Sequence, residues 1–245
     1  MDAQTGTPTA SPRQPSAIMR QLALLESHAP ISRRVYEAGE HVFHAVDRFE
    51  RLYVVNAGLC KTVAVSQDGR EQVAAVHFKG DWMGLGGIAA GHYGCDAVAM
   101  DTSEVWSIDY RSLLEACGRA PDLLVALHLA MSRELLREQA STLALCTLPA
   151  DARVAEFLRW WVSELEERGL RTDSVRLPMS RAEIGNYLGM TLESVSRAFS
   201  RLARRDLIRF ADRGRRDIVI PALAALGNFS QQCVEERESE RFVLH

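Results

Sequence analysis

The stretch 178–210 constrains the fold of this chain more than any other, because it has the pattern of two short helices joined by a tight turn. Ser180 followed by Glu183 has the spacing of a capping box, which begins a helix. Gly189 suits the left-handed backbone that ends a helix, and Thr191 can cap the next one. The pattern predicts a helix-turn-helix, whose second helix must be apolar behind and polar in front.

An excess of arginine follows the predicted second helix. Residues 197–216 contain eight arginines and two acidic residues, although the whole chain carries a formal net charge of −3 at pH 7. Neutralised phosphates supply most of the affinity for a duplex, so a local basic surface matters more than net charge. Two short strands are predicted at 207–210 and 217–220, forming a wing-like hairpin around Asp212 and Gly214. A helical hairpin packed in a core would not need this charge, so double-stranded DNA is the expected partner.

These residues resemble the winged helix-turn-helix of the CRP/FNR family of bacterial transcription regulators, particularly its FNR-like branch. The resemblance rests on the motif IGNYLG at 184–189 and on the residues that follow it, and it extends from about Ile31 to about Leu226. It implies that Glu193, Ser196 and Arg197 contact base edges of a TTGA-type half-site, and all three side chains can pair with bases in a major groove. The residues expected to contact the DNA backbone are Ser180, Thr191, Ser200, Arg201, Arg204, Arg213, Arg215 and Arg216.

The chain before this motif consists of short segments of strand character broken by glycine turns, which predicts a small antiparallel barrel or roll. It resembles the β-roll of the cyclic-nucleotide-binding fold, including the turn at Gly58. The expected fold class is α+β: an N-terminal cyclic-nucleotide-binding-like antiparallel β-roll, a long dimerisation helix and a C-terminal winged helix-turn-helix. The expected parts are a disordered tail, the roll, the long helix, the DNA-binding domain and a C-terminal tail, at residues 1–17, 18–120, 121–148, 149–226 and 227–245.

A long helix is predicted from Pro121 to about Thr147, since proline is favoured at the first helical position. A second apolar stripe on this helix can pack on the roll, while a heptad seam suits a partner copy. A homodimer is also what a palindromic operator requires. Glu138 interrupts the seam, where two facing copies would repel unless the side chain points to solvent. The seam consists of Leu124, His128, Met131, Leu135, Glu138, Thr142 and Leu145.

The sequence leaves several effectors open for the roll. The segment 92–96 lacks the arginine that cyclic-AMP-binding relatives use for the phosphate, which argues against cyclic AMP. No cysteine precedes Cys60, which argues against the iron–sulfur cluster of the oxygen-sensing branch. The alternatives are haem or another small ligand without which DNA binding is off, oxidation of the thiol of Cys95 or Cys117, or no effector. The candidate effector residues are His77, Gly80, Asp81, His92 and Cys95.

Other functional classes find less support in the sequence. No Walker loop, nucleophile elbow or metal-ligand spacing is present, so neither an enzyme nor a metal site is expected. No apolar run approaches the ~20 residues that span a bilayer, and the first residues lack a signal-peptide core. Five cysteines without a C-x-x-C pair are typical of a cytoplasmic chain. The resemblance implies RNA polymerase as a second partner and activation of transcription. The rival class, a protein-contact signalling module, does not account for the basic stretch.

Overall fold

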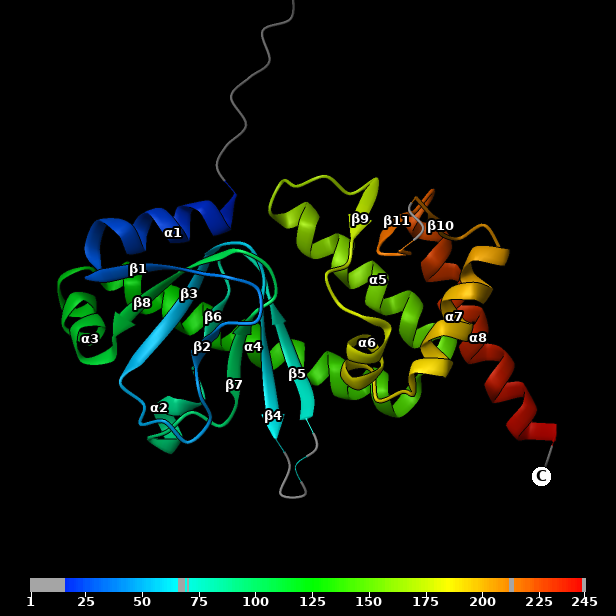
Figure 1. Cartoon of the computed structure of the whole chain (residues 1–245), viewed down its shortest axis with the longest axis horizontal. Coiled ribbons are helices and arrows are strands. Elements are labelled where there is room, and N and C mark those ends of the chain that lie inside the picture. The colour runs from blue at the N-terminus through cyan, green and yellow to red at the C-terminus, as the bar shows by residue number, and fades with distance from the viewer. Residues whose placement is uncertain (1–15, 66–68, 70, 212–213, 244–245) are drawn as a thin grey trace, which may run out of the picture.

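The computed structural model describes residues 16–65, 69, 71–211 and 214–243, so all but two residues of the expected N-terminal tail lie outside it. Figure 1 shows a β-roll on one side of the molecule and a mostly helical C-terminal part on the other. The long helix α4 (Pro121–Thr147) connects the two, and it has the predicted bounds. The expected α+β fold class, with a roll, a long helix and a helix-turn-helix, is confirmed.

The roll consists of two four-stranded antiparallel sheets with the orders β1-β8-β3-β6 and β2-β7-β4-β5. At Gly58, between β3 and β4, φ is +80° and an added Cβ would clash with Ser103, which explains the glycine. The strands are β1 (Ile31–Tyr36), β2 (His41–Phe43), β3 (Arg51–Ala57), β4 (Cys60–Val65), β5 (Glu71–His77), β6 (Trp82–Met83), β7 (Asp96–Ala99) and β8 (Ser103–Asp109).

Helices pack on the roll and connect it to the C-terminal part. Ser16 caps α1 (Ala17–His28), which packs Leu22 and Leu25 on the first sheet. Asp109 caps α3 (Tyr110–Arg119), and α4 follows with a proline at its start and an apolar stripe that includes Leu123 and Leu127 facing the roll. The remaining helices are α2 (Gly87–Ala90), α5 (Ala150–Glu167), α6 (Arg181–Tyr187), α7 (Leu192–Arg204) and α8 (Leu223–Val243).

The C-terminal part differs from the sequence prediction at two places. A third strand, β9 (Ser174–Arg176), joins the wing, which has the order β10-β11-β9 and shorter strands than predicted, β10 (Arg209–Phe210) and β11 (Asp217–Val219). Helix α8 runs across the expected boundary between 226 and 227, because Leu226 and Phe229 lie one turn apart and both are buried in the core that includes α5. Part of the expected C-terminal tail therefore belongs to the packed domain.

The roll and the DNA-binding part share one hydrophobic core. Val76 and Phe78 of the roll pack in the same cluster as Phe157 and Trp161 of α5. Phe78 and Trp161 meet edge to face, with ring centroids 5.0 Å apart. This contact places α5 directly against the second sheet of the roll.

Helix α6 closes the open edge of that sheet. Strand β5 is an edge strand, and the Asn186 side chain accepts from the backbone N–H of Val73 and donates to the carbonyl of Glu71. Lys61 of β4 adds an ion pair of 2.6 Å to Glu183. The helix therefore satisfies backbone groups that would otherwise be exposed along the strand.

Candidate functional site

The helix-turn-helix is built by side chains at the predicted cap positions. The Ser180 hydroxyl accepts from the Glu183 N–H at 3.2 Å, and the Glu183 carboxylate accepts from the Ser180 N–H at 2.8 Å, so the capping box is confirmed. The Thr191 hydroxyl caps α7 by accepting from the backbone of Ser194 at 3.2 Å. An added Cβ at Gly185 would lie 2.7 Å from a backbone oxygen in the turn, so the two helices approach closely only because this residue is glycine.

Helix α7 has one buried and one open face, as the sequence predicts. Its buried residues are Val195, Ala198, Phe199 and Leu202. On the other face Glu193 and Arg197 are exposed and Ser196 is half-buried. Hydrogen bonds from its own backbone N–H and from Thr191 lower the pKa of Glu193, so this carboxylate is charged at neutral pH. The three predicted base-reading residues therefore lie together on an accessible surface.

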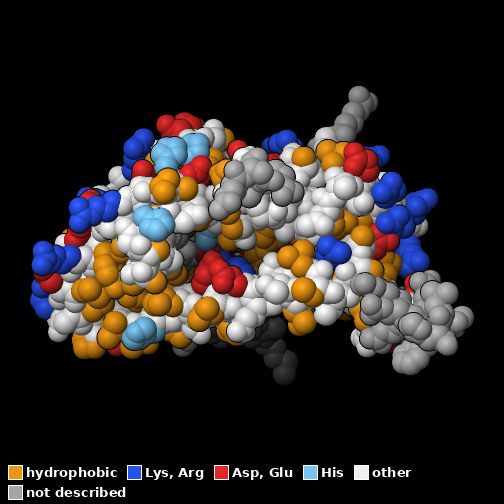
Figure 2. Space-filling model, turned by 90° about the horizontal axis from the view of Figure 1, so that it is seen from below, with side chains coloured by type: hydrophobic (Ala, Val, Ile, Leu, Met, Phe, Trp, Pro, Cys, Tyr) orange, Lys and Arg blue, Asp and Glu red, His pale blue; other side chains and the backbone are white. Residues whose placement is uncertain are grey.

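A shallow basic hollow of about 570 Å³ lies beside this face. Its wall on the wing side includes Phe210 of β10, and the Arg215 guanidinium lies 5.1 Å from the centre of that ring. Figure 2 shows Lys and Arg side chains gathered at the end of the molecule that holds the C-terminal part. The hollow is lined by Ser196, Arg197, Ser200, Arg201, Ala203, Arg204, Phe210 and Arg215.

The predicted backbone-contacting residues are placed unequally. Arg204, Arg215 and Arg216 are exposed, whereas Arg213 lies outside the described residues. The Arg201 guanidinium forms a two-pronged ion pair with Asp151 of α5. Arg201 is therefore held within the domain in this arrangement. The hydroxyls of Ser180 and Thr191 accept the capping hydrogen bonds, and Ser200 donates to a backbone carbonyl of its own helix.

Helix α4 exposes every residue of the predicted seam, including Leu135 at 60 % and Leu124 at 40 % of full exposure. The exposed apolar surface is wider than predicted, because a neighbouring stripe that the heptad analysis missed is open as well. That stripe is detectable from its spacings of four and seven residues. It consists of Val125, Leu129, Leu136 and Leu143.

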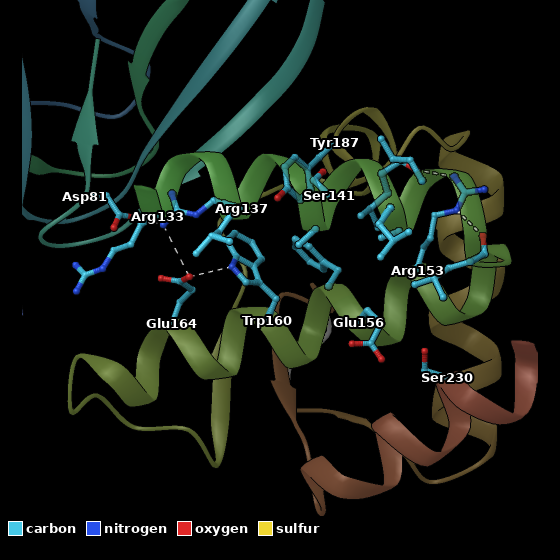
Figure 3. Close-up of a pocket in the computed structure, with 18 of the residues that line it drawn as sticks. Asp81, Arg133, Arg137, Ser141, Arg153, Glu156, Trp160, Glu164, Tyr187 and Ser230 are labelled. Carbon is cyan, nitrogen blue, oxygen red and sulfur yellow. Dashed lines mark hydrogen bonds and ion pairs between the residues drawn. The ribbon is translucent and has the colours of Figure 1, made fainter. Parts of the chain in front are cut away.

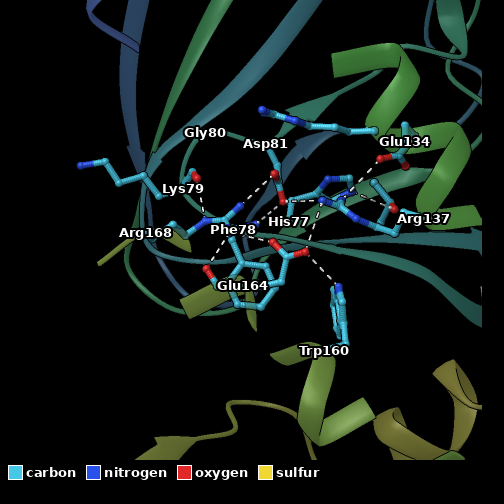
Figure 4. A network of polar contacts seen from close by, with 12 residues as sticks. His77, Phe78, Lys79, Gly80, Asp81, Glu134, Arg137, Trp160, Glu164 and Arg168 are labelled. Carbon is cyan, nitrogen blue, oxygen red and sulfur yellow. Dashed lines mark hydrogen bonds and ion pairs between the residues drawn. The ribbon is translucent and has the colours of Figure 1, made fainter. Parts of the chain in front are cut away.

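An ion-pair network joins the roll, α4 and α5 around Asp81 (Figure 4). Arg168 donates to Asp81 at 3.0 Å, and Arg137 of α4 donates to the other carboxylate oxygen at 3.2 Å. The neighbouring Gly80 has φ of +88° and packs against Ile18, where a Cβ would clash. Two of the candidate effector residues, Gly80 and Asp81, thus hold helices on the roll and do not face its cavity.

The cavity of the roll lies beneath α4 and measures about 220 Å³. His77 and Cys95 line it, whereas the exposed His92 does not, so the proposed haem ligands are not brought together. Burial lowers the pKa of His77 to about 4. Its Nε2 lies 3.2 Å from the Thr62 hydroxyl, whereas its Nδ1 has no hydrogen-bond partner among the described residues. Burial also raises the pKa of the Cys95 thiol. A smaller fraction of the thiol is therefore ionised, and oxidation is slower because the thiolate is the reactive form. Glu134, Arg137 and Glu138 line the same cavity, and Arg137 is already paired with Asp81 and Glu134, so the carboxylates oppose an anionic ligand.

A second cavity of about 620 Å³ lies between α4 and α5 (Figure 3). Trp160 and Leu136 line it, and the Trp160 indole N–H donates to Glu164 at 2.9 Å. At its far end Arg153 donates to the carbonyl of Leu188 at 2.9 Å, which ties α5 to the turn of the helix-turn-helix. Most of the polar side chains that line this cavity form hydrogen bonds or ion pairs with other residues of the chain.

The residues present do not fit an iron–sulfur cluster. Cys60 and Cys117 are buried in separate cores of the roll, and Cys146 is exposed on α4. Within the described residues, one group of three metal-ligating side chains lies close together, and it contains no cysteine. In the same part of the chain, no helix has the length and apolar character needed to cross a membrane.

Comparisons with known proteins agree with this architecture. The Crp-like helix-turn-helix domain matches residues 152–229, and the cyclic nucleotide-binding domain matches residues 33–120. The transcriptional activator protein Anr of Pseudomonas protegens is 37 % identical over 175 residues, which are 71 % of this chain and 72 % of that protein. The fumarate and nitrate reduction regulatory protein of Escherichia coli is 31 % identical over 185 residues, which are 76 % of this chain and 72 % of that protein.

Solved structures show the same arrangement of domains. The structure of FixK2 from Bradyrhizobium japonicum superposes with a TM-score of 0.71 at 30 % sequence identity, covering 81 % of this chain and 96 % of that one. A regulatory protein from Silicibacter pomeroyi, described as cAMP-binding, superposes with a TM-score of 0.61 at 26 % identity, covering 88 % of this chain and 94 % of that one.

Proposed function

Because the chain belongs to the CRP/FNR family of transcription regulators, we propose that it is a homodimeric, sequence-specific DNA-binding activator. In this proposal α7 enters the major groove of each half of a TTGA-type palindrome, and the protein contacts RNA polymerase at promoters in the cytoplasm. The observation that carries the proposal is the open face of α7, where Glu193, Ser196 and Arg197 stand beside a basic hollow. Such a face combines base-edge contacts with phosphate neutralisation.

Fluorescence anisotropy tests the proposal on a TTGA-type palindrome and on a scrambled duplex of equal length, at two salt concentrations. We expect selective binding to the palindrome and weaker binding to both duplexes at the higher salt concentration, because counterions are released from the phosphates. Binding that does not distinguish the two duplexes would contradict sequence-specific recognition by this protein on its own.

The exposed apolar face of α4 is the proposed dimer interface. The Leu135→Glu variant places a charge in its middle, where the leucine is 60 % exposed in the single chain. We expect this variant to sediment as a monomer and to bind the palindrome at least about tenfold more weakly, since the second half-site is no longer linked to the first. Leu170→Glu, at a leucine that is 54 % exposed outside α4, is the matched control and should leave both properties unchanged. A dimeric Leu135→Glu variant would contradict this interface.

Glu138 has its own expected effect on the dimer. The side chain is exposed on α4, next to Leu135 on the predicted seam. If two copies face each other there, Glu138→Ala removes a like-charge contact and should lower the dissociation constant of the dimer roughly tenfold. Sedimentation at several concentrations measures this constant, with Gln139→Ala as the neutral control. An unchanged constant would mean that Glu138 points away from the partner copy, toward solvent or the cavity of the roll that it lines.

For the roll, we propose that any regulatory ligand is small and uncharged and binds in the cavity beneath α4. The cavity of about 220 Å³ is smaller than the ~300–1,000 Å³ typical of ligand pockets. Arg137 also lines the cavity but is paired with Asp81 and Glu134, so the two carboxylates disfavour a phosphate. Among the described residues, the buried Nδ1 of His77 is an unused hydrogen-bonding atom. A ligand at this position would contact both the roll and α4, the helix of the proposed dimer.

A further inference from the structure

We propose that His41, His44 and Asp96 form a binding site for a divalent transition-metal ion on the outer surface of the roll. One ligand atom from each side chain lies within 4.8 Å of the other two. The group is separate from the DNA-binding face and from the cavity beneath α4, whose lining residues include none of the three. The sequence alone does not indicate it, because Asp96 is more than fifty residues from the two histidines.

Strand pairing brings the three residues together. His41 begins β2 and Asp96 begins β7, and the two strands pair antiparallel with His41 opposite Val98. The register shifts between His41 and Phe43, and this irregularity interrupts the strict alternation of side chains. His44 therefore lies on the same exposed side as His41, with Val42 and Phe43 buried between them.

The distances suit a shared cation better than direct hydrogen bonds. His41 Nε2 lies 3.7 Å from one Asp96 oxygen, and His44 Nδ1 lies 3.8 Å from the other. Hydrogen bonds between such groups are shorter, about 2.7–3.2 Å. Two ligands on one tetrahedral zinc ion, each bound at about 2.0–2.2 Å, lie about 3.4 Å apart. Both nitrogen–oxygen distances lie within a few tenths of an ångström of that value, and the three ligand atoms, all within 4.8 Å of one another, would move closer together around the ion.

Neighbouring groups fix the Asp96 carboxylate and the backbone at His44 before any ion arrives. The imidazole rings of His41 and His44 are stacked, with centroids 4.3 Å apart and planes 27° from parallel, so the rings must turn for both nitrogens to bind one ion. The Asp96 carboxylate accepts from the backbone N–H of Ala45 at 2.6 Å, and the Asp47 carboxylate accepts from the backbone N–H of His44 at 3.1 Å. Such supporting hydrogen bonds orient metal ligands and reduce the ordering that binding requires.

The ligand chemistry indicates the class of ion. Two imidazoles and one carboxylate suit zinc, nickel or copper, whereas magnesium and calcium prefer oxygen ligands alone. The side chains of His41, His44 and Asp96 are 40 %, 59 % and 24 % exposed, so water completes the coordination and the ion can exchange with solution. The ion would link the start of β7 to the end of β2. Cys95, which precedes β7, lines the cavity of the roll.

Isothermal titration of the full-length chain with zinc chloride tests the site. All proteins would carry Cys146→Ser, because Cys146 is exposed and can bind zinc independently. We expect one zinc ion per chain, at least a tenfold weaker affinity in His41→Ala and in Asp96→Asn, and no competition by magnesium. His92→Ala removes another exposed histidine of the roll and should leave zinc binding unchanged.

Asp96→Asn retains the shape of the side chain and an acceptor for Ala45, so it separates loss of a metal ligand from loss of folding. A thermal melt without metal gives a second measurement: the variants should match the parent, and added zinc should raise only the melting temperatures of the parent and of His92→Ala. Zinc affinity unchanged in both His41→Ala and Asp96→Asn, or lost equally in His92→Ala, would overturn the proposal.

Discussion

Replacing Arg168 with alanine is expected to lower the free energy of unfolding by about 3–5 kcal/mol, because it removes one partner from a buried ion-pair network. The Arg168 side chain is 3 % exposed and donates to Asp81 at 3.0 Å and to Glu164 at 2.6 Å. Its Nε also donates to the carbonyl of Lys79 at 2.8 Å. The substitution removes one donor each from Asp81, Glu164 and the Lys79 carbonyl, and leaves Arg137 as the remaining cation beside the two carboxylates. Urea unfolding followed by tryptophan fluorescence measures the loss.

Arg171→Ala provides the control for this result. Arg171 also pairs with an acidic residue, Asp173, but both side chains are largely exposed, at 78 % and 64 %. Exposed pairs of this kind contribute little to stability, so the urea midpoint of Arg171→Ala should match that of the wild type. A loss in Arg168→Ala no larger than that in Arg171→Ala would contradict a structural role for the network.

Replacing Arg197 with alanine should weaken binding to the preferred operator by about 1–3 kcal/mol and relax the preference at one base position. Arg197 is exposed on α7, and its guanidinium contacts the neighbouring Ser194 at 3.3 Å, so it is available to a guanine edge. Competition between operators that carry single base changes measures both the affinity and the lost discrimination.

Arg215→Ala separates base reading from phosphate contact. Arg215 lies beside Phe210 in the same basic hollow but on the wing. Its loss should weaken binding to matched and scrambled duplexes equally and reduce the salt dependence by about one phosphate contact. If Arg197→Ala instead behaved like Arg215→Ala, with discrimination equal to the wild type, Arg197 would not read a base.

Local sequence signals predicted the helix-turn-helix well. Ser180 and Glu183 form the expected capping box, Thr191 caps α7, and Gly189 has φ of +59° in the turn. Pro121 begins α4 as expected. Each of these features is decided by residues within one or two helical turns of one another, so spacing alone was sufficient. The resemblance to a known family then supplied the order of the parts.

Contacts between residues far apart in the sequence could not be predicted from such local signals. The sequence indicates Asp81 as a candidate effector residue, but its partners Arg137, on α4, and Arg168, at the end of α5, lie far along the chain. Asn186 belongs to the recognised motif, yet its side chain bonds the backbone of β5. The C-terminal boundary differs for the same reason, since Phe229 can be recognised as a core residue only when α5 is in place beside it.

Selection of bound duplexes from a randomised DNA library by the full-length protein tests the central claim most directly, because it assumes no operator. Recognition by α7 in a homodimer predicts enrichment of two inverted TTGA-like half-sites, with centres about one helical turn, or 10–10.5 base pairs, apart. Enrichment of a single half-site without an inverted partner, or no enrichment over the starting library, would contradict the account.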